Sequence, residues 1–131
     1  MEEPGRVRIE IEQIMLDLDF SYECRSDVQL ICEEILCNII TYGFPSHSDH
    51  SFEMQFVFDG RSLTLEFIDG GIAFDPLSRP DPNLDDPEAE DRPVGGLGIF
   101  LVKELSDQQS YQRRAGKNHL TVKRSVSVLK D

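Results

Sequence analysis

Glycine is concentrated in one short stretch of this chain, residues 94–98 (VGGLG), which leads directly into an apolar segment at 99–105. Glycine allows a backbone to approach a ligand closely. A helix that begins at such a point directs unpaired N–H groups and a partial positive charge at whatever lies in front of it, which suits phosphate. Glycine clusters also mark ordinary loops. This stretch alone therefore leaves a phosphate site and a plain loop equally open.

The composition restricts the possible functions. A chain of 131 residues suits one compact domain, and a hydrophobic share of 39% supplies a core. The net charge of −12 argues against binding to nucleic acid or to an anionic membrane surface. The chain has no long apolar run for a membrane span and no signal-peptide core. Cys24, Cys32 and Cys37 lack CxxC spacing, so we expect reduced thiols and a cytoplasmic protein.

Two helices are predicted in the first third of the chain. Apolar residues at positions 7, 9 and 11 alternate as in a strand, whereas those at 7, 11, 15 and 18 form a helical stripe. The run lasts to position 20 without a break, which favours the helix. A second helix is predicted from an N-cap at Ser26 to about Tyr42, where Gly43 and Pro45 end it. Glu34 and Asn38 share one face of that helix.

The rest of the chain predicts two hairpins and a long loop. Alternating apolar residues at 52–58 and 63–67 flank Asp59-Gly60, and a closing hairpin is predicted from 111–115, a turn at 116–118 and 120–128. Residues 77–93 are acidic, rich in proline and non-periodic, as in a functional lid. His47 and His50 fit a solvated loop better than a metal site. Helices mixed with hairpins predict an α+β fold, with helices on one face of a mostly antiparallel sheet.

Three motifs occur in a fixed order, although each alone has an ordinary explanation as a polar helix face, a turn or a glycine loop. They are Glu-x-x-x-Asn on a helix, Asp-x-Gly after a strand, and Gly-Gly-Leu-Gly after a lid. Together they make the chain resemble the GHKL ATPase superfamily, with its Bergerat fold. The nearest subgroup is the anti-sigma-factor serine/threonine kinases, also called switch-protein kinases. The resemblance is carried by residues 33–40, 69–76 and 95–103 and covers roughly 11–124.

The resemblance implies an ATP site built from the three motifs. Asn38 would ligate Mg²⁺, which prefers oxygen ligands and would bridge the ATP phosphates. Glu34 would act as the general base on the attacking hydroxyl. Asp69 would accept a hydrogen bond from the adenine amino group, and Gly71 would give the base room. The glycine loop would hold the phosphates through Gly95, Gly96, Leu97 and Gly98. Thr121, on the closing hairpin, would support the adenine.

The function implied is that of an ATP-dependent protein kinase. It would phosphorylate a Ser or Thr of a STAS-domain antagonist, and a sigma factor is a further partner that the resemblance allows. One alternative is a nucleotide-responsive binding module, against which Glu34 argues, because binding alone needs no base. Another is a plain ATPase, which the sequence does not separate from a kinase because the same base could activate water.

The chain departs from the family pattern at two points. Ala73 stands where many relatives carry a second glycine, so we expect a tighter pocket. The family fold begins with a strand before the first helix, and this chain starts too late for a full one. The first strand is therefore expected to be missing or altered, and because that sheet edge often serves in dimerisation, a homodimer stays open. The lid at 77–93 is expected to become ordered when ATP binds.

Overall fold

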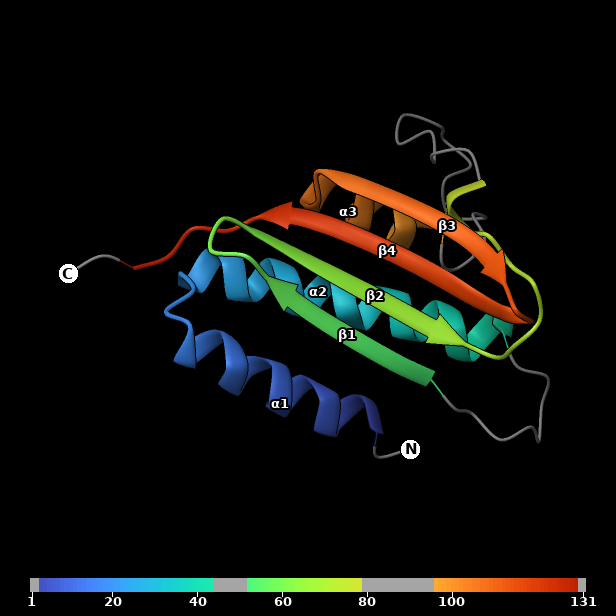
Figure 1. Cartoon of the computed structure of the whole chain (residues 1–131), viewed down its shortest axis with the longest axis horizontal. Helices are drawn as coiled ribbons and strands as arrows, with labels where there is room; N and C mark the ends of the chain where they lie inside the picture. The colour runs from blue at the N-terminus through green and yellow to red at the C-terminus, as the bar shows by residue number, and fades with distance from the viewer. Residues whose placement is uncertain (1–2, 44–51, 79–95, 130–131) are drawn as a thin grey trace, which may run out of the picture.

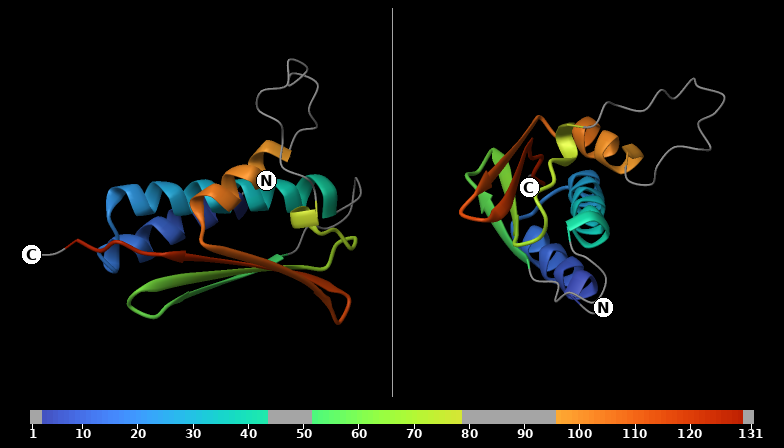
Figure 2. Two further views of the ribbon diagram at one scale, coloured as in Figure 1. Left: turned by 90° about the horizontal axis from the view of Figure 1, so that it is seen from above. Right: turned by 90° about the vertical axis from the view of Figure 1, so that its right-hand side faces the viewer.

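The computed structural model describes residues 3–43, 52–78 and 96–129. Its elements are the helices α1 (Glu3–Asp17), α2 (Tyr22–Asn38) and α3 (Gly96–Leu105), the short turns η1 (Ile39–Gly43, π) and η2 (Pro76–Ser78, 3₁₀), and the strands β1 (Phe52–Phe58), β2 (Ser62–Asp69), β3 (Gln108–Arg114) and β4 (Lys117–Ser125). All strand pairs are antiparallel, in the order β1-β2-β4-β3. The helices cover one face of this sheet (Figures 1 and 2), so the predicted α+β sandwich is confirmed.

The first segment is a helix, as its stripe predicted. Ile11 and Met15, four residues apart, are buried, whereas Ile9 is 71% exposed. A strand would have placed positions 9 and 11 on the same face. Among the described residues no strand precedes α1, and no helix is long and apolar enough to cross a membrane.

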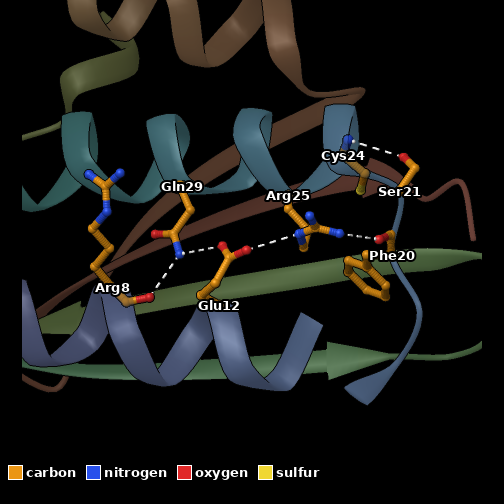
Figure 3. Close-up of polar contacts among 7 residues, drawn as sticks. All are labelled: Arg8, Glu12, Phe20, Ser21, Cys24, Arg25 and Gln29. Carbon is orange, nitrogen blue, oxygen red and sulfur yellow. Dashed lines mark hydrogen bonds and ion pairs between the residues drawn. The ribbon is translucent and has the colours of Figure 1, made fainter. Parts of the chain in front are cut away.

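The predicted start of α2 was wrong. The N-cap is Ser21, whose side chain accepts a hydrogen bond from the Cys24 N–H at 3.2 Å, and Ser26 lies exposed inside the helix. The reason lies in contacts between this segment and other parts of the fold. Arg25 donates to the Phe20 carbonyl at 2.9 Å and to Glu12 of α1 at 2.9 Å, which holds the chain in helical geometry before Ser26 (Figure 3).

The two serines give a matched test of this helix start. Ser21→Ala is expected to lower the free energy of unfolding by about 1 kcal/mol, because it removes the cap. Ser26→Ala is expected to leave that free energy unchanged or raise it by a few tenths of a kcal/mol, because alanine is the better helix former. Urea denaturation of both variants measures the difference. A larger loss for Ser26→Ala would contradict the observed cap.

A small polar cluster fixes α1 against α2 (Figure 3). The Glu12 carboxylate receives Arg25 Nε at 2.9 Å and Gln29 Nε2 at 3.2 Å, and Gln29 also donates to the Arg8 carbonyl at 2.8 Å. Charge-assisted hydrogen bonds of this kind are the stronger ones. They set the position of α2, the helix that carries Glu34 and Asn38.

The first hairpin has the predicted turn. Gly60 adopts φ 98°, and the Asp59 carboxylate accepts hydrogen bonds from the Ser62 N–H at 2.7 Å and the Arg61 N–H at 2.9 Å. These two bonds lower the pKa of Asp59 below its ordinary value. On β2, Leu63, Leu65 and Phe67 enter the core. The strand then ends at Asp69, which places that carboxylate at the edge of the core.

The second hairpin turns earlier than predicted. Ala115 and Gly116 both have positive φ, 54° and 75°, and Lys117 already begins β4. Asn118 is therefore a strand residue, not part of the turn. On β4 the side chains of Asn118, Leu120 and Val122 are buried on the helix-covered face of the sheet.

The three cysteines are free, as expected. Cys24 and Cys32 are buried, and Cys37 is exposed. Burial raises the pKa of the Cys32 thiol to about 12, so this thiol stays neutral and unreactive. His47 and His50, and the lid from residue 79 to 93, lie outside the described residues.

Candidate nucleotide site

Residues from two of the three motifs meet at one end of the sheet. Asn38 ends α2 and Asp69 ends β2, and both line one cavity of about 30 Å³. The full lining is Ile35, Asn38, Ile39, Asp69, Phe74, Pro76, Tyr111, Asn118 and Leu120. This volume is about that of one water molecule. A purine base therefore requires part of the lining to move, and Phe74 and Pro76, which lie outside the main helices and strands, are the natural candidates.

Asp69 is a buried carboxylate with one oxygen unused. It is 5% exposed, and its Oδ1 accepts from the Gly71 N–H at 2.9 Å and from Asn118 Nδ2 at 3.0 Å. No described residue donates to Oδ2. An open carboxylate oxygen at a cavity can accept a hydrogen bond, for example from the amino group of a base.

The segment after Asp69 is tied to the neighbouring hairpin. The Gly71 carbonyl accepts from Arg113 Nη1 at 2.8 Å, and Gly71 itself is buried. Ala73, by contrast, is exposed and does not line the cavity. The expected tightening of the pocket by Ala73 is therefore not supported, because its side chain lies outside the pocket.

Asn38 is buried, with 6% of its surface exposed, and the nitrogen of its side-chain amide, Nδ2, has no hydrogen-bond partner among the described residues. Buried polar atoms are nearly always paired, so an orphaned amide at a cavity marks a place for a ligand. The described residues hold no cluster of three His, Cys, Asp or Glu that could bind a metal alone. The unpaired Nδ2 is a donor and fits an acceptor such as a phosphate oxygen, while the amide oxygen is of the kind that Mg²⁺ prefers as a ligand.

Glu34 lies one helical turn before Asn38 and faces the start of α3. A Cβ added to Gly98 would lie 2.2 Å from Glu34 Oε2. Any other residue at position 98 would require the end of the half-buried Glu34 side chain to move. Gly96 and Leu97 begin this helix, while Gly95 lies outside the described residues. The carboxylate thus lies beside a helix N-terminus, the kind of site that attracts phosphate.

Of the described candidates only Asn38 and Asp69 line the cavity, and Thr121 lies on the other face of the sheet. Its hydroxyl donates to Glu66 Oε2 at 3.4 Å, on the sheet face opposite the helices. The cavity is lined instead by Asn118, which the sequence interpretation had placed in a turn. Strand parity could have identified it, because residues 118, 120 and 122 share a face and 121 does not.

Comparison with known proteins identifies the family of this chain. Residues 3–124 match the family described as "Histidine kinase-like ATPase domain". The chain is 31% identical over 112 residues to the serine/threonine-protein kinase BtrW of Bordetella bronchiseptica, covering 86% of this chain and 78% of that protein. It is 27% identical over 103 residues to the serine-protein kinase RsbW of Listeria monocytogenes, covering 76% and 66%. The chain therefore belongs to the histidine kinase-like ATPase domain family, where its place is with the serine/threonine-protein kinases, as the GHKL resemblance predicted.

Proposed function

We propose that this protein is an ATP-dependent kinase that phosphorylates a Ser or Thr hydroxyl of a STAS-domain antagonist of an anti-sigma factor. The observation that supports transfer, rather than binding alone, is the close approach of Glu34 to Gly98. A carboxylate beside a phosphate site repels phosphate in the ground state. Such a carboxylate is well placed to act as a base. The kinase names of the relatives point the same way.

The chemistry needs few groups, because phosphoryl transfer is mainly positioning and charge neutralisation. Bound Mg²⁺ would neutralise the phosphate charge. Asn38 would hold the ion through its amide oxygen, and the N-terminal turn of α3 would direct its N–H groups at the phosphates. Glu34 would take the proton as the hydroxyl oxygen bonds to the γ-phosphorus and the bond to the leaving ADP breaks.

Recognition of the adenine base would belong to Asp69 and Gly71. The unused Oδ2 of Asp69 would accept a hydrogen bond from the adenine amino group, and the buried Gly71 leaves room beside it. The proposal extends to a sigma factor as a second partner. That part rests on the family resemblance, not on a described surface.

The proposal is tested by transfer of label from γ-labelled ATP to STAS proteins encoded in the same genome. We expect one of them to become labelled on Ser or Thr, with little phosphate released to water. Release to water without transfer to any partner would identify a plain ATPase. ATP-dependent binding of a partner that never becomes labelled would identify a nucleotide-responsive switch.

Gly98→Ala should separate stability from catalysis. The new methyl group must displace the Glu34 carboxylate, because the two would otherwise lie 2.2 Å apart. We expect roughly tenfold slower transfer, because small misplacements of a catalytic group are costly, and stability unchanged or raised by up to about 1 kcal/mol, because alanine replaces glycine in a helix. Transfer rates and urea denaturation measure the two effects.

The same variant in a Glu34→Gln background provides the control. If Gly98→Ala acts by displacing the base, it should slow transfer little further once the base is gone. An equal loss in both backgrounds would show that Gly98 acts through the phosphate loop alone.

A further inference from the structure

Asn118 is the most extensively bonded buried polar side chain at the cavity, and the proposed chemistry assigns it no role. It is 5% exposed. Its Nδ2 donates to Asp69 Oδ1 at 3.0 Å and to the Ile72 carbonyl at 2.8 Å. Its Oδ1 accepts from the Phe74 N–H at 3.3 Å, from Arg113 Nη1 at 3.2 Å and from the Tyr111 hydroxyl.

These contacts fix the orientation of the amide. A carboxamide has two N–H donors and one acceptor oxygen, and here both donors face acceptors while the oxygen faces three donors. If the amide were turned over, donor would face donor or acceptor would face acceptor at every contact except that with the Tyr111 hydroxyl, which can also accept. Since no donor is left over, Asn118 has no N–H to offer a nucleotide. Its effect must pass through the groups that it holds.

The group that matters is Asp69. Asn118 and the Gly71 N–H both bind Oδ1, and this leaves Oδ2 as the open acceptor. The same amide binds Ile72 and Phe74, so it also attaches the segment that follows Asp69 to β4. Arg113 strengthens this attachment from β3 by binding both Asn118 Oδ1 and the Gly71 carbonyl.

We propose that Asn118 is a positioning residue for base selection: it holds Asp69 with one oxygen presented to a 6-amino group of a purine. The inference rests on the proposed function, in which Asp69 binds adenine. A purine with hydrogen at position 6 loses this hydrogen bond, and a 6-oxo purine would place a carbonyl against the carboxylate. Asn118 therefore controls the preference between bases, whereas a merely structural residue would affect all nucleotides alike.

The test measures the affinities of ATP and of purine riboside 5′-triphosphate, which lacks the amino group, each with Mg²⁺. The parent should prefer ATP by about tenfold or more, the size of one hydrogen bond to a charged group. In Asn118→Ala the affinity for ATP should fall by roughly that factor while the affinity for the analogue stays nearly constant. The preference should then largely disappear.

Two further variants keep the test decisive. Arg113 is exposed, so Arg113→Met should fold even if Asn118→Ala does not, and we expect it to reduce the preference about two- to threefold through a weaker hold on Asn118. Thr64→Val, on the opposite face of the sheet, should leave the preference unchanged. The proposal is overturned if Asn118→Ala and Arg113→Met weaken both nucleotides in parallel or neither. A parent that binds no Mg-ATP would instead overturn the proposed function, and this inference with it.

Discussion

Glu34→Gln is expected to slow phosphotransfer by about 10²–10⁴-fold, the usual contribution of a general base. The affinity for Mg-ATP should stay nearly constant, because the base acts mainly in the transition state. The two side chains have the same shape, so the close approach of α3 at Gly98 is preserved. Single-turnover transfer to the antagonist and the ATP dissociation constant, measured on the same preparation, check both statements.

The neighbouring glutamate provides the matched control. Glu33 is exposed and lies 4.0 Å from Arg8 of α1, away from the cavity. Glu33→Gln removes the same charge at the adjacent position and should leave transfer unchanged. If Glu34→Gln transfers phosphate as fast as the parent, the base assignment is wrong. If both variants are equally slow, the net charge of α2 matters and the position of Glu34 does not.

Local pattern was sufficient to predict most of the fold. The alternation at 52–58 and 63–67 with Asp59-Gly60 between them contains both strands and their turn, because neighbours in sequence make that hairpin. The stripe of Ile11 and Met15 likewise predicts α1. The start of α2 was not predictable in this way. It depends on Glu12, which binds Arg25, and on Phe20, which bridges to Val128 near the other end of the chain.

The site residues also divide into those that the sequence pattern predicts and those that it does not. Glu34, Asn38 and Asp69 could be selected from sequence because their spacing and order carry the family pattern. Asn118 was missed because the predicted turn at 116–118 removed it from the strand, although strand parity could have identified it. A shift of one residue in a strand exchanges the two faces of the sheet. Asn118 and Thr121 are three positions apart on β4, an odd number, so Asn118 faces the cavity and Thr121 lies on the opposite face.

Asn38→Ala is expected to make the protein more stable and inactive. The unpaired Nδ2 of Asn38 costs stability while it is buried without a partner. Alanine removes that cost and favours the helix, so we expect the free energy of unfolding without nucleotide to rise by about 0.5–2 kcal/mol. Thermal and urea denaturation of the nucleotide-free protein measure this change.

The same change should remove the metal ligand. Mg-ATP should then stabilise the variant no more than ATP with a chelator does, because a ligand stabilises only the state that it binds. Transfer should fall on the order of 10²-fold or more, since a bound metal ion contributes several kcal/mol of charge stabilisation.

Asn38→Asp is expected to show the opposite pattern. It keeps an oxygen ligand but buries a charge, so it should be less stable alone and regain stability with Mg-ATP. If Asn38→Ala is destabilised, the unpaired Nδ2 is not a cost to the fold. If the variant retains a Mg²⁺-dependent shift, the ion is held elsewhere.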